Sequence, residues 1–276
     1  MAQRVWLITG ASRGFGAEIS KAVLASGDKL VATARTTQGL QHLGTNGNLF
    51  TAVLDVTDEL QVRDAVQAAL AHFGHVDVLV NNAGISLLGA VEESSGDEVE
   101  RLYRTNVFGM LNVTRALLPS MRQRRSGHII NISSVAGYSA YAGFGVYSST
   151  KFAVEGLTEA LHIELAPLGI HATVVEPGFF RTDILDTSRS LIETAARITD
   201  YADTAGAMRD AVPGYNHQQP GDPAKLASAI LTLVNAADPP LRLPLGPDTL
   251  KRMAEKNALV ERETSIWRSL AASTDH

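Results

Sequence analysis

Short apolar segments alternate with longer amphipathic segments along this chain, and the alternation limits the folds open to it. The apolar segments lie at residues 4–9, 30–33, 49–54, 76–80, 128–132 and 171–175. Each is short and mostly apolar, as expected for parallel strands covered on both faces. Strands that alternate with helices form βαβ units with right-handed crossovers. The pattern predicts an α/β fold: a single-domain doubly wound parallel sheet (Rossmann fold) with helices on both faces.

Three of the intervening helices have clear sequence signals. Asp58 and Gln61 are spaced as a capping box, and apolar residues follow at helical spacing. A second helix carries Val99, Tyr103, Asn106, Met110, Val113 and Leu117 on one stripe, and we expect it to end before Pro119. A third is expected at about residues 224–236, between pairs of proline and glycine.

We expect residues 1–276 to form one domain. Residues 179–217 follow the sixth strand and have no clear strand signal, which places them over the carboxyl ends of the strands, where ligands bind in such sheets. This segment is predicted to be a mobile substrate flap. Residues 248–276 read as a C-terminal helical tail.

Composition excludes several classes of protein. Hydrophobic residues make up 45% of the chain, enough for a large core, and the net charge of −5 argues against a nucleic-acid partner. The chain has no cysteine, which excludes disulfides, a cysteine nucleophile and thiolate metal sites. No segment approaches the roughly 18 apolar residues of a membrane span. We therefore expect a cytoplasmic protein with no membrane partner. His72 and His75 lack further ligands, so no metal site is expected either.

A glycine-rich turn directly follows the first predicted strand. Gly10, Gly14 and Gly16 are spaced G-x-x-x-G-x-G and lead into a helical pattern. Glycines there let backbone N–H groups approach a pyrophosphate at a helix N-terminus. The spacing is a variant of the dinucleotide fingerprint, and its place between strand and helix predicts a dinucleotide-binding turn.

The second strand bears on the choice of cofactor. NAD-specific folds place an acid about 20 residues beyond the glycines, against the ribose 2′-hydroxyl. Here the strand ends in Ala34-Arg35 with no acid, and Arg13 lies inside the glycine turn. Guanidinium groups bind phosphate through several donors, so the pair predicts NADP(H). The alternative left open is that both arginines are solvated surface residues.

Tyr147 is the only one of the six tyrosines with a lysine four residues later, Lys151. Residues at this spacing share one helix face, and an ammonium beside a phenol lowers its pKa. Ser134 lies just past the fifth strand, where its hydroxyl can hold a substrate oxygen beside the phenol. Asn106 is an amide within an apolar stripe, so it needs hydrogen-bond partners.

These motifs occur in one order over residues 4–182: 9–16, 81–84, Asn106, Ser134, Tyr147-x-x-x-Lys151 and Pro177-Gly178. Together they closely resemble the short-chain dehydrogenase/reductase family. The resemblance implies that Tyr147 is the general acid and base, that Lys151 lowers its pKa and binds the nicotinamide ribose, that Ser134 orients the carbonyl, and that Asn106 anchors a relay water. The cofactor-binding residues are then Gly10, Ser12, Arg13, Gly14, Phe15, Gly16, Arg35, Asp55, Val56, Asn82, Ala83, Gly84, Tyr147, Lys151, Pro177, Gly178 and Thr182.

The predicted activity is that of an NADPH-dependent carbonyl reductase acting on a ketone or secondary alcohol. Ser134, Tyr141, Phe144, Tyr147 and Phe179 are the predicted substrate contacts, which implies a largely apolar substrate. A 3-oxoacyl thioester or steroid reductase of the same fold stays open, as does a non-catalytic NADP(H)-sensing regulator. A homodimer or homotetramer is expected, although two prolines in the last apolar segment, 241–247, weaken it as a pairing edge.

Overall fold

The computed structural model describes residues 3–275 of the protein, so residues 1, 2 and 276 at the ends of the predicted domain lie outside it. Seven parallel strands form one sheet in the order β3-β2-β1-β4-β6-β7-β9. They are β1 (Val5–Ile8), β2 (Lys29–Ala34), β3 (Leu49–Val53), β4 (Val78–Asn81), β6 (Gly127–Ile132), β7 (Ile170–Pro177) and β9 (Arg242–Leu245). The predicted doubly wound α/β fold is confirmed, and the first six of these strands match the six predicted segments.

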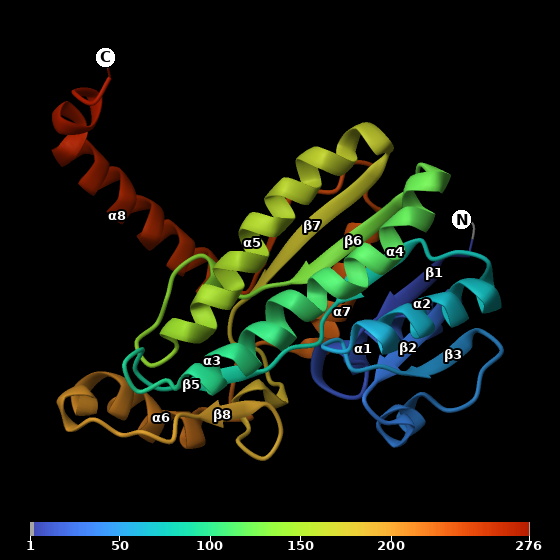
Figure 1. The fold of residues 1–276 in the computed structure, drawn as a ribbon, viewed down its shortest axis with the longest axis horizontal. Helices are drawn as coiled ribbons and strands as arrows, with labels where there is room; N and C mark the ends of the chain where they lie inside the picture. Colours follow the sequence, from blue (N-terminus) through green and yellow to red (C-terminus); the bar gives the residue numbers. More distant parts are fainter. Residues whose placement is uncertain (1–2, 276) are drawn as a thin grey trace.

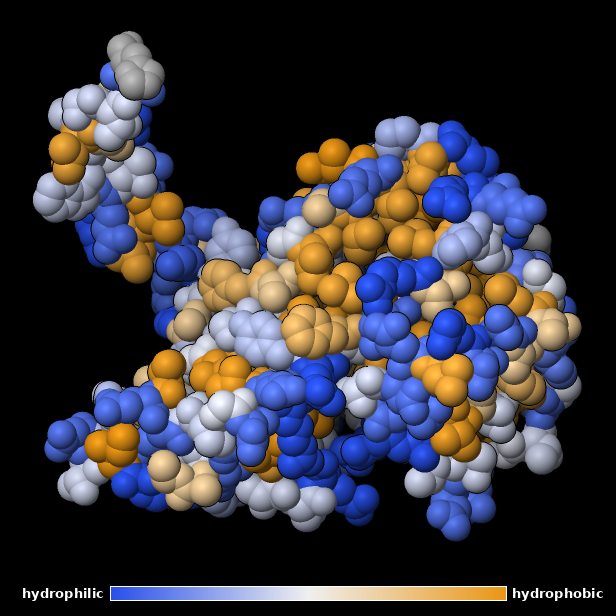
Figure 2. All heavy atoms as spheres, viewed as in Figure 1, coloured by the Kyte–Doolittle hydropathy of each residue, from blue (hydrophilic) through white to orange (hydrophobic). Residues whose placement is uncertain are grey.

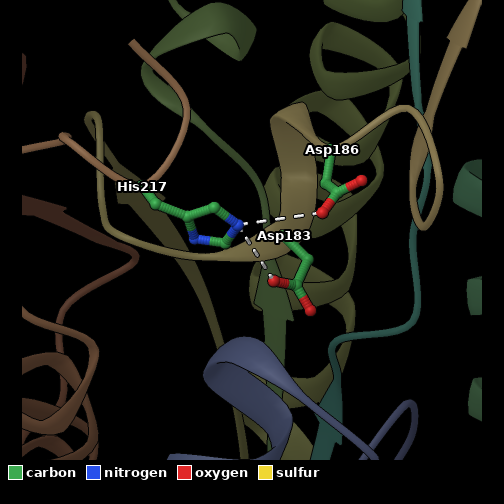
Figure 3. Close-up of side chains that lie close together, drawn as sticks. All are labelled: Asp183, Asp186 and His217. Atoms are coloured by element: carbon green, nitrogen blue, oxygen red, sulfur yellow. Dashed lines mark ion pairs between the residues drawn. The ribbon is translucent and has the colours of Figure 1, made fainter. Parts of the chain in front are cut away.

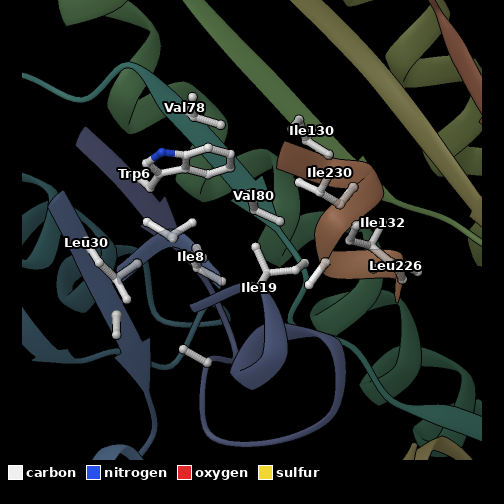
Figure 4. Close-up of a cluster of buried hydrophobic side chains, with 14 of the residues drawn as sticks. Trp6, Ile8, Ile19, Leu30, Val78, Val80, Ile130, Ile132, Leu226 and Ile230 are labelled. Atoms are coloured by element: carbon white, nitrogen blue, oxygen red, sulfur yellow. The ribbon is translucent and has the colours of Figure 1, made fainter. Parts of the chain in front are cut away.

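Helices cover both faces of the sheet (Figure 1). On one face lie α1 (Gly14–Ala25) and α7 (Pro223–Asn235), and on the other α2 (Glu59–Phe73), α4 (Met110–Arg124) and α5 (Gly145–Leu165). Successive residues of a strand point to opposite faces, so Trp6 and Ile8 join the core under α1 and α7, while Leu7 joins the core on the other face. Figure 4 shows the first core, in which Trp6 is fully buried.

The helix α2 begins at the predicted residue, but its capping differs in part. The Asp58 carboxylate accepts hydrogen bonds from the backbone N–H groups of Leu60 and Gln61, as an N-cap should. The Gln61 side chain does not return to the Asp58 N–H. Its oxygen accepts from the Asp55 N–H at 3.1 Å, and its nitrogen donates to Asp58 Oδ2 at 2.9 Å. The side chain of Gln61 thus also holds Asp55, in the connection between β3 and α2.

The prediction that the second helix ends before Pro119 is wrong. The chain runs through α3 (Gly96–Tyr103), a π-helical segment η2 (Arg104–Gly109) and α4, which continues past Pro119 to Arg124. Leu117 and Met121, on either side of the proline, are both fully buried. Their burial offsets the hydrogen bond that proline cannot donate inside a helix.

The segment 179–217, which has no clear strand signal in the sequence, contains a short strand. Leu191–Glu193 forms β8, which pairs in parallel with β5 (Ser86–Leu88) in a separate two-stranded sheet. A three-residue strand has too little periodicity to be seen in the sequence. The segment also contains α6 (Ala207–Tyr215). The remaining short segments are the 3₁₀ turns η1 (Thr37–Leu43), η3 (Val135–Gly137), η4 (Ala166–Leu168), η5 (Asp183–Leu185) and η6 (Thr199–Tyr201), and the π-helical η7 (Ala202–Gly206).

The predicted tail is one helix, α8 (Pro247–Ala272), which follows the edge strand β9 and projects away from the sheet (Figure 1). Its first turns contact the body and its second half is exposed, including Trp267. Among residues 3–275, no helix combines the length and apolar character that crossing a membrane requires.

Candidate active site

A cavity of about 670 Å³ opens at the carboxyl ends of the central strands. Nearly every residue predicted for the site lines it, from the glycine turn and the ends of β2, β3 and β4 to the turn after β7. Gly16 and Asn106 are the two predicted residues that do not. The lining includes Gly10, Ser12, Arg13, Gly14, Phe15, Arg35, Asp55, Val56, Asn82, Ala83, Gly84, Ser134, Tyr141, Phe144, Tyr147, Lys151, Pro177, Gly178, Phe179 and Thr182.

The glycine turn has the backbone that only glycine adopts easily. Gly10 and Gly14 have φ values of +66° and +54°. A Cβ at Gly16 would lie 2.2 Å from the Gly10 carbonyl oxygen, so this glycine closes the turn from inside and does not face a ligand. The three glycines therefore shape a cradle at the N-terminus of α1, and Gly16 acts through the shape of that cradle.

Asn82 braces this turn. Its side-chain nitrogen donates to the carbonyl oxygens of Thr9 and Gly10 at 2.9 and 3.1 Å. In return, Thr9 Oγ1 accepts from the N–H groups of Asn82 and Ala83, both at 3.0 Å. The amide nitrogen of Asn82 is thus committed to the backbone, and its part in cofactor binding is mainly to hold the cradle.

Arg13 and Arg35 lie at the same end of the cavity. Burial lowers the pKa of Arg13, the nearby Asp183 carboxylate raises it, and Arg35 lowers it. The Arg13 guanidinium donates to the Arg189 carbonyl at 3.1 Å and to Ser190 Oγ at 2.9 Å, which ties the glycine turn to the flap. The glycine turn and the end of β2 therefore present two neighbouring guanidinium groups.

Three side chains of the flap, Asp183, Asp186 and His217, cluster together (Figure 3), and Arg13 lies beside the first of them. His217 Nε2 lies 3.8 Å from Asp183 Oδ1 and 3.7 Å from Asp186 Oδ2, and Arg13 Nε lies 3.8 Å from Asp183 Oδ2. Two carboxylates and an imidazole are ligand types that divalent metals accept, but here the Arg13 cation faces the same acids. We read the cluster as an ion-pair network that fastens the two ends of the flap together. The expectation of no metal site stays a prediction.

Tyr147 and Ser134 meet at the floor of the cavity. Tyr147 lies in the first turn of α5, and Ser134 lies just past β6, where its hydroxyl oxygen accepts the Ala136 N–H at 3.1 Å. Burial raises the pKa of Tyr147 to about 12, and a hydrogen bond with the Ser134 side chain lowers it. The phenol is therefore held protonated at neutral pH, beside a hydroxyl that can form a hydrogen bond to the same substrate oxygen.

Lys151 lies one turn further along α5 on the same face. Its ammonium donates to the Ile132 carbonyl at 2.9 Å and lies 5.7 Å from the centre of the Tyr147 ring. Burial lowers the pKa of Lys151 to about 8, while the Glu155 carboxylate raises it. The sequence interpretation expects the lysine to depress the pKa of the tyrosine. In this structure burial has the larger effect on Tyr147, in the opposite direction.

Asn106 lies behind the cavity wall in the π-helical segment η2. Its oxygen accepts from the Ile85 N–H at 2.9 Å, and its nitrogen donates to the Ile85 carbonyl and to Thr150 Oγ1. This buried amide is satisfied, as its place in an apolar stripe requires. It joins the β4–β5 connection to α5 next to Lys151.

Aromatic side chains form the opposite end of the cavity. The Tyr141 ring packs edge-on against Phe179 at 5.8 Å, and Phe179 against Tyr215 at 5.4 Å. Two residues at the start of α8 hold this wall. Asp248 accepts the Phe179 N–H at 2.7 Å, and the Arg252 guanidinium lies 4.8 Å from the centre of the Tyr141 ring. Leu185 and Phe144 belong to the same apolar cluster as Leu191 of β8.

Comparison with known proteins decides the family. The family model described as short chain dehydrogenase matches residues 4–192. The chain belongs to the short-chain dehydrogenase/reductase family. It is 38% identical to a 3-ketodihydrosphingosine reductase of Bacteroides thetaiotaomicron, covering 90% of this chain and 89% of that protein. It is 35% identical to an oxidoreductase of Botryotinia fuckeliana, covering 98% and 99%.

Solved structures of the family agree with the fold. A short-chain dehydrogenase from Streptomyces avermitilis has a TM-score of 0.92 and 40% identity, and the match covers 100% of both chains. A family member from Burkholderia phymatum, solved in complex with NAD, has a TM-score of 0.84 and 26% identity over 95% of each chain. ElxO, solved with NADP bound, has a TM-score of 0.74 and 29% identity, covering 91% of this chain and all of that one.

Several residues that line the cavity of this dehydrogenase were missed by sequence reasoning. Gln219, in the flap connection, is 1% exposed, and neither atom of its amide has a hydrogen-bond partner within residues 3–275. Asp97 and Arg101 of α3 and Met208 of α6 also line the cavity. None of them belongs to a motif. For one of them, Met208, the sequence does offer a signal, because this residue lies within the predicted flap, residues 179–217.

Proposed function

We propose that this protein is an NADPH-dependent carbonyl reductase that exchanges a hydride between NADP(H) and a ketone or secondary alcohol. The observation that carries the proposal is the place of the Tyr147–Ser134 pair. It lies where the glycine cradle and the aromatic wall meet in one cavity. A cofactor held by the cradle and a carbonyl held against the wall would both reach this point.

The glycine cradle fits a dinucleotide. The turn around Gly10 and Gly14 opens α1, whose N-terminal N–H groups favour a pyrophosphate. A Cβ at Gly10 would already lie 3.0 Å from the Ala83 Cα, so larger side chains would fill the cradle. When bound, the nicotinamide supplies the hydride; Lys151, Pro177, Gly178 and Thr182 would hold that half of the cofactor.

NADP is the preferred form in this proposal. Solved relatives have been obtained with either NAD or NADP, so family membership alone leaves the choice open. Arg13 and Arg35 lie together at the cavity end, and β2 ends without an acid. A 2′-phosphate would take the place between these two cations, and the end of β2 itself offers no carboxylate for a 2′-hydroxyl.

The side chains at the cavity floor suit reduction. The Tyr147 phenol, with its pKa raised to about 12, keeps its proton at neutral pH and donates it to the carbonyl oxygen. The Ser134 oxygen already accepts the Ala136 N–H, so its own proton is available to the substrate oxygen as negative charge develops. The reverse reaction needs the phenolate, so oxidation of the alcohol is expected to require a higher pH. The water that resupplies the proton is expected at Asn106, whose side-chain amide is itself bonded to Ile85 and to Thr150, next to Lys151.

The substrate is expected to be largely apolar, with Tyr141, Phe144 and Phe179 as contacts. A long-chain β-keto compound is a specific candidate, because a relative with 38% identity is a 3-ketodihydrosphingosine reductase. A 3-oxoacyl thioester or a steroid would suit the same wall. A non-catalytic NADP(H) sensor is disfavoured, because it would not need the Ser134, Tyr147 and Lys151 arrangement.

A homodimer or homotetramer belongs to the proposal. Apolar side chains gather over α4 and α5 on the face shown in Figure 2. In this part of the chain Phe108 of η2 is 51% exposed, and Phe152 and Ile163 of α5 are 46% and 73% exposed. A second copy covering this face would bury them. A cytoplasmic location stays a prediction from the sequence.

Loss of NADPH absorbance with a panel of aldehydes, aryl ketones, β-keto esters and steroids tests the function. Tyr147→Phe should reduce turnover by about 10²–10⁴-fold, because the proton donor is lost. NADPH affinity, measured by fluorescence titration, should stay close to that of the wild type. Wild-type turnover in the variant would remove Tyr147 from the mechanism. Failure of the wild type to oxidise NADPH with any carbonyl would favour the sensor.

A further inference from the structure

Two buried glutamates lie directly behind the proposed catalytic residues. Glu155 is on α5, one helical turn after Lys151, and Glu176 is on β7, one residue before Pro177. Their side chains are 6% and 0% exposed. Ser133, next to Ser134, lies within hydrogen-bonding reach of Glu155, and Glu155 within reach of Glu176. The pair thus has one member on the helix that carries Lys151 and lies next to the segment that carries Ser134.

One cation serves both acids. Arg242, the first residue of β9, donates to Glu155 Oε2 and, at 2.8 Å, to Glu176 Oε1. Its other nitrogen is shared with Glu159, whose side chain is 49% exposed, and the guanidinium stacks over the Tyr138 ring. A single, partly exposed arginine therefore faces two buried carboxylates and one that is half in solvent.

The two remaining oxygens lack a donor. Within residues 3–275, neither Glu155 Oε1 nor Glu176 Oε2 has a hydrogen-bond partner, and the nearby Ser133 hydroxyl, the one neutral donor within reach of Glu155, is unpartnered as well. Two carboxylates this close cannot both ionise easily, and a proton on one of them supplies the missing donor. Burial raises the pKa of Glu155 to about 7, and burial also raises that of Glu176.

We propose that Glu155 and Glu176 share one proton at neutral pH and that Glu155 is a positioning residue for Lys151. The inference rests on the proposed function of Tyr147 and Lys151. When the shared proton leaves, a second negative charge appears behind Lys151, one turn away on the same helix, and favours its ammonium form. The charged groups that face Glu155 are Lys151 and Glu159 from α5, Glu176 from β7 and Arg242 from β9, with the Tyr138 phenol beyond the arginine.

The charge balance gives a sharp test with Glu155→Gln. Below the pH at which the pair loses its proton, wild type and variant both carry one negative charge, so their turnover should be similar. Above it, only the wild type gains the second charge. The alkaline limit of turnover, which is the pH above which turnover falls as Lys151 loses its proton, should therefore be about one pH unit lower in the variant. This size follows from Coulomb's law at an effective dielectric constant of about 20. Glu159→Gln, on the same helix and arginine but half-exposed, is the matched control and should leave that limit unchanged.

A second measurement does not depend on turnover. An acid whose pKa is raised in the folded state takes up a proton on folding, so its contribution to stability is lost as the pH rises from about 4.5 to about 7. Melting temperatures of the cofactor-free protein should decline across this range in the wild type, and Glu155→Gln should remove that decline.

The outcomes separate the two proposals. A variant that loses stability equally at every pH, with an unchanged pH profile of turnover, would mean a purely structural glutamate and overturn the inference. A wild type without turnover would overturn the proposed function, while the melting curves would still report whether the proton is shared. A shifted alkaline limit together with a flat melting profile supports both.

Discussion

The cofactor end and the substrate end of the cavity are built in different ways. The cofactor end comes from turns that directly follow β1 and β4, and backbone conformation defines it: Gly10 and Gly14 have positive φ values. The substrate end is assembled from side chains far apart in the sequence, such as Tyr141, Phe179 and Asp248. A backbone requirement restricts which residues a position tolerates, whereas a packed wall can be built from many combinations. Only the cofactor end can therefore be recognised in the sequence as a motif.

The largest difference between the two ends is expected when the contact between Glu93 and Arg209, which holds the flap in place, is broken. The Glu93 side chain is 0% exposed and accepts from the Ala90 and Ile198 N–H groups and from Arg209 of α6. Arg209→Leu would leave this carboxylate buried without its cation, which costs about 3–5 kcal/mol. Urea denaturation should show the loss, while NADPH affinity changes little, because the cofactor end does not depend on this contact.

The exposed pair Arg197–Glu193 in the same flap is the control, since Arg197→Leu should cost less than about 1 kcal/mol. Equal losses in the two variants would contradict the role of Arg209. The hydrogen bond from the Ile198 N–H is the largest influence that holds the pKa of Glu93 at about 2. The contribution of Glu93 to stability is therefore complete above about pH 4.5 and is lost as the pH falls towards 2.

The second effect concerns the cofactor end alone. The double change Arg13→Ala with Arg35→Ala should weaken NADPH binding by about 10–100-fold, because charge-assisted hydrogen bonds to the 2′-phosphate are lost. NADH binding should hardly change, and fluorescence titration of both cofactors measures the ratio. Arg63→Ala, an exposed arginine on α2 that does not line the cavity, is the control. Parallel weakening of NADH and NADPH would contradict a phosphate-specific role.

The smallest effect should appear at the substrate end. Asp248→Asn weakens the bond from the Phe179 N–H and should raise KM for bulky ketones by about 2–10-fold. The affinity for NADPH should stay the same. Glu263→Gln, an exposed residue further along α8, should change neither value. A change in NADPH affinity alone would mean that Asp248 serves the cofactor end through Gly178.

The sequence was sufficient for the sheet, the glycine turn and the arrangement of Tyr147, Lys151 and Ser134 on one edge, because strand order and local spacing decide these. It failed where distant contacts decide the outcome. Pro119 stays helical because buried neighbours hold it. The strand β8 exists because β5 lies beside it. The raised pKa of Tyr147 depends on how deeply the finished fold buries the phenol, which no spacing of residues reports.

The position of Asp248 along the chain has a consequence for biosynthesis. It follows all strands of the sheet and the whole flap in sequence, yet it holds Phe179 in the wall of the cavity. A polypeptide leaves the ribosome from its N-terminus, and its first elements begin to fold before the last are made. The nucleotide cradle can therefore form on a nascent chain, whereas the pocket for the second ligand is finished only when α8 has been translated. Substrate recognition would thus be acquired later in synthesis than cofactor binding.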